Sequence, residues 1–132
     1  MRLITRSDFD GLACGALLLA AKVVDSWMFA HPKDIQDGLV PVTENDVLAN
    51  VPYAPGCGLW FDHHSSEEER LKIKGKYKGE SRISPSAARI IYEYYGGKEC
   101  FPNFDDLMLA VDKVDSGNLT AEEILEPTGW IL

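Results

Sequence analysis

The tripeptide Asp62-His63-His64 carries the side chains best suited to chemistry in this sequence. It follows the apolar run 57–61, which predicts a buried strand that ends at the tripeptide. In open α/β sheets, ligands bind beyond the carboxyl ends of the strands. A lone histidine is more often structural than a ligand, but two adjacent histidines after an aspartate at a strand end indicate a metal site.

Two more carboxylates, Asp8 and Asp10, stand two residues apart in the loop 7–11. An extended loop would turn both side chains toward the same space, and like charges held together usually have a cation between them. Alternatively, one of the two is the N-cap of the next helix. Asp115, after the last expected helix, adds a third carboxylate. Mixed Asp and His ligands favour Mn²⁺, Mg²⁺ or Fe²⁺.

Short apolar runs alternate with helical patterns along the chain, which predicts an α/β protein. We expect strands at 2–5, 27–30, 46–51 and 58–61, and helices at 11–24, 84–95 and 105–112. A further helix start is expected at 65–69. The predicted fold is a three-layer, open, mostly parallel sheet with helices on both faces. Six basic residues lie between Arg70 and Arg82, and those from Lys72 to Lys78 occupy alternate positions. This pattern favours a solvated edge strand over a polyanion-binding stripe.

Length and composition restrict the class of protein. With 132 residues, 45% of them apolar, the chain is long enough for one domain. The net charge of −8 argues against binding to duplex nucleic acid. No apolar stretch predicts a membrane span or a signal peptide, so a cytoplasmic protein without membrane contact is expected. The three cysteines, Cys14, Cys57 and Cys100, lack metal-site spacing and are expected to be small buried packing residues.

These motifs resemble a known family. The loop 7–11, the tripeptide 62–64 and the stretch 115–119 are similar to the first, third and fourth motifs of the DHH phosphoesterase superfamily, and 84–88 resembles the helix start after the third. The stretches 45–53 and 58–64 look most like the exopolyphosphatase-related branch. The resemblance covers nearly the whole chain. It implies that residues 1–132 form a DHH-type domain, the N-terminal part of a longer protein with a separate C-terminal substrate domain.

The resemblance also implies roles for individual side chains. The implied metal ligands are Asp8, Asp10, His63 and Asp115, while His64 would orient a substrate phosphate and Asp62 would support the pair. The implied reaction is metal-assisted hydrolysis of a phosphate ester or anhydride, in which two ions about 3.5–4 Å apart act together. The implied substrates are polyphosphate, a short nucleotide phosphate or a short single-stranded nucleic acid.

Two positions depart from the family pattern. Arg6 stands where the family has a histidine, and a guanidinium has no lone pair to give to a metal. Asn50 stands where the family has a bridging aspartate. An amide oxygen can bind a hard cation, but it carries no charge to hold two cations together. The metal centre is therefore expected to be degenerate.

We accordingly expect one divalent cation rather than two, with Mn²⁺ as the first choice and Mg²⁺ as the alternative. Asp10, His63 and Asp115 would hold it. Arg6 would then pair with Asp8, or bind a phosphate oxygen through its forked donors.

Three functions are compatible with the sequence. A metal-dependent phosphohydrolase is slightly favoured. The alternative is a non-catalytic descendant that binds a nucleotide, polyphosphate or partner in the same cleft. A third hypothesis makes the cluster a structural ion site.

Overall fold

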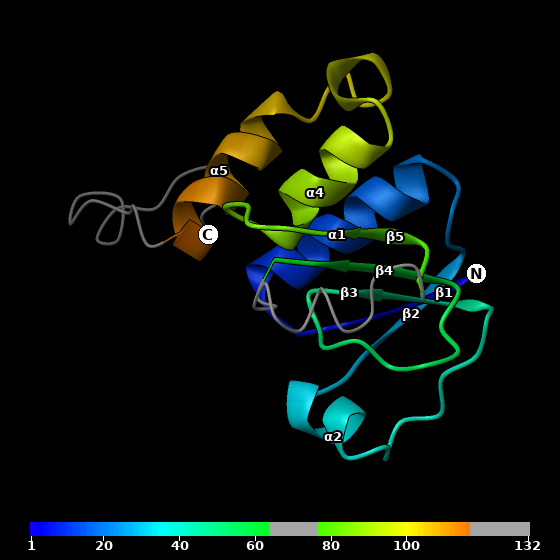
Figure 1. The fold of residues 1–132 in the computed structure, drawn as a ribbon. Coiled ribbons are helices and arrows are strands. Elements are labelled where there is room, and N and C mark those ends of the chain that lie inside the picture. Colours follow the sequence, from blue (N-terminus) through cyan, green and yellow to red (C-terminus); the bar gives the residue numbers. More distant parts are fainter. Residues whose placement is uncertain (64–76, 117–132) are drawn as a thin grey trace.

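A single sheet of five parallel strands organises the protein, in the order β2-β1-β3-β4-β5 (Figure 1). The computed structural model describes residues 1–63 and 77–116 and, for residues 115 and 116, the backbone alone. The strands are β1 (Arg2–Thr5), β2 (Ser26–Phe29), β3 (Asp46–Ala49), β4 (Leu59–Asp62) and β5 (Gly79–Ser81). The predicted α/β class and parallel sheet are confirmed.

Helices lie on both faces of the sheet, as predicted. They are α1 (Phe9–Ala20), α2 (Pro32–Gln36), α4 (Ala87–Tyr94) and α5 (Asp105–Ser116), with a short 3₁₀ helix, η1 (Gly97–Glu99). In Figure 1, α1, α4 and α5 cover one face and α2 lies on the other. The chain steps from β1 to β2 in one direction and from β2 to β3 in the opposite direction. Crossovers of one hand then place their helices on opposite faces.

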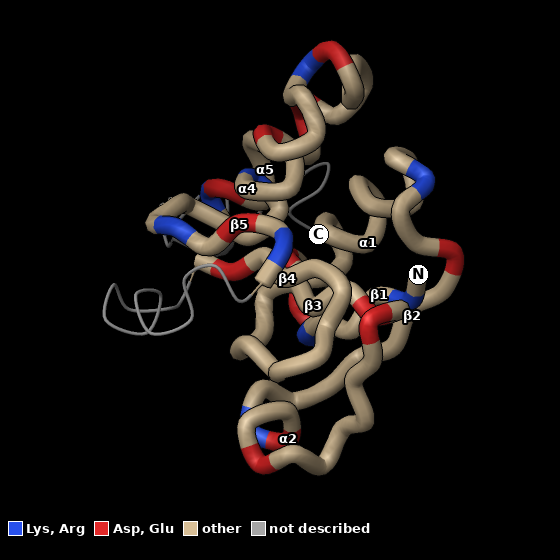
Figure 2. Tube along the Cα trace, turned by 45° about the vertical axis from the view of Figure 1, so that its right-hand side comes forward, with Lys and Arg blue, Asp and Glu red and all other residues tan. Residues whose placement is uncertain are grey.

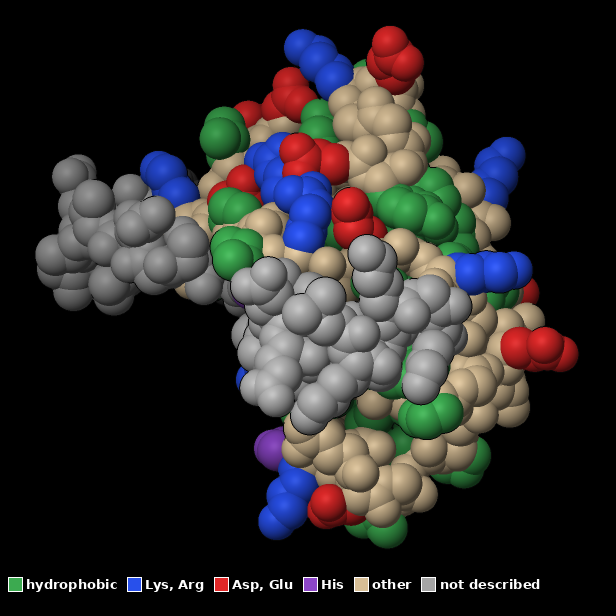
Figure 3. All heavy atoms as spheres, in the orientation of Figure 1, with side chains coloured by type: hydrophobic (Ala, Val, Ile, Leu, Met, Phe, Trp, Pro, Cys, Tyr) green, Lys and Arg blue, Asp and Glu red, His purple; other side chains and the backbone are tan. Residues whose placement is uncertain are grey.

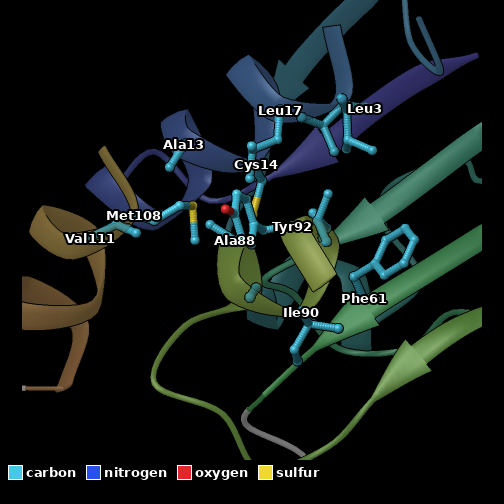
Figure 4. Packing of buried hydrophobic residues seen from close by; sticks show 14 of the residues in the cluster. Leu3, Ala13, Cys14, Leu17, Phe61, Ala88, Ile90, Tyr92, Met108 and Val111 are labelled. Carbon is cyan, nitrogen blue, oxygen red and sulfur yellow. The ribbon is translucent and has the colours of Figure 1, made fainter. Parts of the chain in front are cut away.

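Alternate strand residues supply two hydrophobic cores. Leu3, Val47 and Phe61 face α1, α4 and α5, whereas Ile4 and Trp60 face α2. Figure 4 shows side chains from the three helices meeting around Cys14, Ala88 and Met108, with Phe61 lying on the sheet to one side. A slip of one residue in any strand would exchange the two sets, so the burial pattern fixes the register. The strand ends, where the polar residues stand, are fixed with it.

The first helix ends earlier than the sequence predicts. The predicted helix extends to Val24, but α1 ends at Ala20. Lys22 has a φ of 60°, and the N–H groups of Lys22 and Val23 donate to the carbonyls of Leu19 and Leu18. This is a Schellman ending, which usually has glycine at the left-handed position. Because this position is occupied by Lys22, the sequence gave no sign that the helix ends here.

Other boundaries also differ from the predictions. The third strand ends at Ala49, not at residue 51, because Asn50 adopts a left-handed φ of 61°. The short helix α2 was not predicted. The strand β5 lies at the edge of the sheet and inside the window 70–82, where the basic residues favoured an edge strand without giving its bounds. The side chain of His31 caps α2, and Pro32 occupies its first turn. The predicted helix start at 65–69 and most of the basic stripe lie outside the described residues.

The cysteine prediction is only partly right. Cys14 is buried and Cys57 is half-buried, but Cys100 is exposed. Cys100 follows η1 at the surface, and its neighbour Phe101 takes the buried position.

Acidic and basic side chains are mixed over the surface. Figure 2 shows short acidic and basic segments scattered among the elements, and Figure 3 shows both signs interspersed with hydrophobic side chains on one face. No helix among residues 1–63 and 77–116 is long and apolar enough to cross a membrane.

An ion pair between Arg2 and Asp46 joins the starts of β1 and β3. Arg2 Nε lies 2.9 Å from Asp46 Oδ1, and the N–H of Thr43 donates to Oδ2 at 2.8 Å. Burial alone would raise the pKa of Asp46, but the hydrogen bonds from Arg2 and Thr43 outweigh it and the pKa is lowered. This carboxylate therefore stabilises the fold above its unfolded pKa of about 3.9, and the contribution is lost as pH falls through the lower folded pKa.

We expect Asp46→Asn to be less stable than the wild type at pH 7 and to differ less from it near pH 3. Urea unfolding at the two pH values measures this. Asp25→Asn is the control, because the Asp25 side chain is 89% exposed and lies 3.8 Å from the N-terminal amine. The same loss at both pH values for Asp46→Asn would contradict the assignment.

Candidate active site

The candidate site lies at the carboxyl edge of the sheet, where the strand order reverses. β1 has β2 on one side and β3 on the other, and such a switch point is where open α/β sheets bind ligands. The loop after β1 supplies Arg6 and Asp8, and α1 supplies Asp10 from its first turn. Asn50 follows β3, and His63 follows β4. These five predicted site residues therefore meet at one edge.

Asp8 is the N-cap of α1 and also joins the loops after β1 and β3. Its Oδ1 accepts the N–H of Gly11 at 2.8 Å. Asn50 Nδ2 donates to Oδ1 at 3.0 Å and to Oδ2 at 3.3 Å, across the switch point. Arg6 Nε lies 3.6 Å from Oδ2, so the two side chains form an ion pair. Donors from the chain itself therefore balance the charge of Asp8.

The side-chain amide oxygen of Asn50 is buried and lacks a hydrogen-bond partner among the described residues. Its side chain is 1% exposed, and Oδ1 accepts no hydrogen bond within the described part of the chain. A buried polar atom without a partner costs about 1–3 kcal/mol. Strained or unsatisfied residues of this kind cluster at functional sites. A hard cation or a ligand donor would satisfy this oxygen.

Asp10 connects α1 to the beginning of α4. Its carboxylate is 1% exposed and accepts the backbone N–H groups of Ala87 and Ala88, each at 2.9 Å. These are the first residues of α4, where the helix dipole favours negative charge. The N-cap alternative therefore holds for Asp8 alone, and Asp10 has a different structural role. The sequence gave no sign of these contacts, because Ala87 and Ala88 lie 77 and 78 positions after Asp10.

His63 is oriented toward Asp10. Its Nδ1 lies 3.0 Å from the carbonyl oxygen of Ser84, which can only accept, so Nδ1 carries a proton. Nε2 lies 3.5 Å from Asp10 Oδ2. In a neutral imidazole these two atoms would both be acceptors, and a cation between them would make the approach favourable. A carbonyl partner on one ring nitrogen is also the usual support for a metal-ligating histidine.

Polar contacts between α4 and α5 place the end of α5. Arg89 Nε donates to Asp112 Oδ2 at 3.0 Å, and Ser86 Oγ donates to Oδ1 at 3.0 Å. Asp115 lies one turn later, in the last turn of α5. Its backbone is placed, but its side chain is outside the described part.

The remaining predicted residues are only partly placed. Asp62 is buried at the end of β4, and His64 lies outside the described residues. Within residues 1–63 and 77–114, no three His, Cys, Asp or Glu side chains are arranged to hold a metal ion. The ligand roles of Asp10, His63 and Asp115 stay predictions.

A pocket adjoins this edge, between the loops after β1 and β2. Its volume is about 280 Å³, and its lining residues are Arg6, Ser7, Asp8, Phe29, Ala30, His31 and Pro32. The sequence predicted only a strand at 27–30 in this region. An aromatic residue directly before a histidine-containing turn was the available signal.

The fold and this edge define the class: the protein has a DHH-type α/β domain. A solved structure described as "pGpG-specific phosphodiesterase - PggH", from Vibrio cholerae, matches 98% of the chain with 45% sequence identity and a TM-score of 0.86. The chain spans 41% of the length of that structure's chain. The match supports the DHH superfamily. No protein-family model and no curated protein matches the chain.

Proposed function

We propose that this chain is the site-bearing domain of a phosphodiesterase that hydrolyses a short nucleotide, such as a linear dinucleotide. The observation that carries the proposal is the buried Asp10–His63 pair, 3.5 Å apart at the carboxyl edge of the sheet. The 45% identity to a pGpG-specific phosphodiesterase supports this class of substrate. Polyphosphate, the substrate of the exopolyphosphatase-related branch, is the competing substrate.

A divalent cation between Asp10 and His63 fits the donors present, with Asp115 as the proposed third ligand. The carbonyl of Ser84 fixes the proton on Nδ1 of His63, which leaves Nε2 as the ligating atom. The amide oxygen of Asn50 is a suitable additional ligand for a hard cation. Mn²⁺ is the expected ion and Mg²⁺ the alternative. When bound, it would stabilise negative charge on the phosphoryl oxygens.

A second cation at Asp8 does not fit. The guanidinium of Arg6 lies 3.6 Å from Asp8, and Asn50 and Gly11 donate hydrogen bonds to the same carboxylate. A divalent ion there would displace these donors and meet the positive charge of Arg6. The proposed centre therefore holds one ion.

The chain's own residues would then bind and orient the substrate. Arg6 pairs with Asp8 through Nε, and its two terminal amino groups suit a phosphate oxygen pair. Asp10 positions His63, while Asp62 would support it. His64 would orient the scissile phosphate.

Release of mononucleotide from pGpG tests the proposal. We expect turnover by the wild type with Mn²⁺ or Mg²⁺ and none with EDTA. His63→Ala should lower kcat/KM by about 10²-fold or more, because it removes a proposed ligand of the cation that would stabilise charge on the phosphoryl oxygens. Lys98→Ala, on the exposed side of η1, is the control. Equal turnover by His63→Ala and wild type would refute the assignment.

The second candidate is a non-catalytic domain that binds a nucleotide. Arg6 and Asn50 favour this candidate, because each stands where the family pattern has an ion ligand, and both side chains contact Asp8. Binding of pGpG without product release in either metal would select this candidate. A titration with Mn²⁺ separates the models further, since two tight sites would exclude the one-ion centre.

A further inference from the structure

The pocket between the loops after β1 and β2 combines an aromatic wall with polar groups. Its apolar side comes from β2 and the start of α2, and its polar side comes from the loop that also carries the candidate active site. Its volume, about 280 Å³, is just below the range of about 300–1,000 Å³ typical of small-ligand sites. The pocket therefore suits one end of a dinucleotide rather than the whole molecule.

Phe29 forms the aromatic wall. It is the last residue of β2, an edge strand, and its ring is 44% exposed. Trp27 is on the same face of β2, because side chains alternate along a strand, and it is 56% exposed. Of these two aromatic residues, Phe29 lines the pocket and Trp27 does not. A large exposed aromatic side chain beside an anion-binding group is a typical stacking surface for a base.

His31 supplies a hydrogen-bond donor at the rim. Its Nδ1 accepts the N–H of Lys33 at 3.1 Å, which caps α2. Nδ1 is therefore the acceptor nitrogen, and Nε2 carries the proton when the ring is neutral. That N–H is suited to a carbonyl or ring nitrogen at the edge of a base.

Arg6 and Asp8 form the charged side of the pocket. Their charges offset each other at 3.6 Å, and Asn50 and Gly11 also donate to Asp8. The side chain of Arg6 is 41% exposed and has no other ion pair or hydrogen bond within the described residues. Its unused donors can reach a ligand phosphate without leaving Asp8.

We propose that this pocket is the nucleobase subsite, in which a purine stacks on Phe29 while Arg6 contacts the phosphate that leads toward Asp10 and His63. The inference rests on the proposed function and specifies its substrate class. Inorganic polyphosphate has no ring to place against Phe29. A nucleotide uses both sides of the pocket, so the pocket favours the nucleotide substrate.

Equilibrium binding of pGpG in EDTA tests the subsite separately from turnover. Phe29→Ala should raise Kd by about 5- to 150-fold, the loss expected when an aromatic ring that stacks on a base is removed. Phe29→Tyr should bind as the wild type does. Trp27→Ala is the matched control, from the same strand and face, and should leave Kd unchanged. His31→Asn keeps a capping acceptor, loses the N–H donor and should raise Kd by a smaller factor.

The outcomes separate the nucleobase subsite from the proposed phosphodiesterase activity. Equal effects of Phe29→Ala and Trp27→Ala, or no binding of pGpG by the wild type, would overturn the subsite. Hydrolysis of pGpG with an unchanged KM in Phe29→Ala would leave the phosphodiesterase standing and remove the subsite. Binding that depends on Phe29, without hydrolysis, would support the subsite and remove the enzyme.

Discussion

Replacing Asp10 by alanine is expected to lower the free energy of unfolding by about 3–6 kcal/mol. The carboxylate accepts two backbone hydrogen bonds from α4 in a fully buried setting, and each hydrogen bond to a charged group is worth about 1.5–3 kcal/mol. Alanine would leave the N–H groups of Ala87 and Ala88 without this acceptor. Urea unfolding followed by circular dichroism measures the loss.

Asp8→Ser is the control for this experiment. Asp8 is also an N-cap, but its side chain is 39% exposed, and serine caps a helix about as well as aspartate. We expect its cost to be about 1–3 kcal/mol, below that of Asp10→Ala. The exposed ion pair with Arg6 contributes little, but the buried Nδ2 of Asn50 loses its acceptor. Similar losses for the two variants would show that Asp10 does not hold α4 in place.

Replacing Gly11 by alanine is expected to disturb both stability and the site. A Cβ at this position would overlap the carbonyl oxygen of Arg6 and lie 3.0 Å from Thr5 Oγ1. Since a backbone atom cannot swing away as a side chain can, α1 or the loop 6–8 must move. Overpacking of this kind costs about 1–3 kcal/mol or more. A displacement of 1 Å in a catalytic group can cost about 10²-fold in rate.

Gly15→Ala is the matched control on the same helix. A Cβ there would lie 3.6 Å from Leu3 Cδ2, an ordinary contact. Alanine should stabilise the protein by about 0.5–1 kcal/mol, since glycine is unfavourable inside a helix. Unfolding midpoints and pGpG turnover of both variants provide the comparison. Gly11→Ala with wild-type stability would contradict the close approach of α1 to β1.

The sequence predicted what depends on local patterns. The apolar runs predicted four of the five strands, and Ser84-Pro85-Ser86 predicted the start of α4, which Ser86 caps. The helix α2, with five residues, was missed, and for β5, with three, the sequence indicated only an edge strand within 70–82. Such lengths give no periodicity to detect.

The site was predicted as a set of residues with one contact among them, the pairing of Arg6 with Asp8, which the structure shows at 3.6 Å. The predicted strands put the candidate residues at one edge of the sheet, and the structure places there Arg6, Asp8, Asp10, Asn50 and His63. The sequence could not show that Asp10 receives α4, because that bond depends on how two distant segments pack. The pocket beside Phe29 was missed for the same reason, since its walls come from two loops.

The bond between Asp10 and α4 has a consequence for the order in which the protein folds. A growing chain emerges from the ribosome N-terminus first. β1 and the loop with Asp8 are then available long before residues 87 and 88, which supply the N–H groups for Asp10. Contacts so distant in sequence form slowly, because a long loop must close first. The acidic centre of the site is therefore completed in the same late step that docks α4, and a chain released before that step has the motif without its geometry.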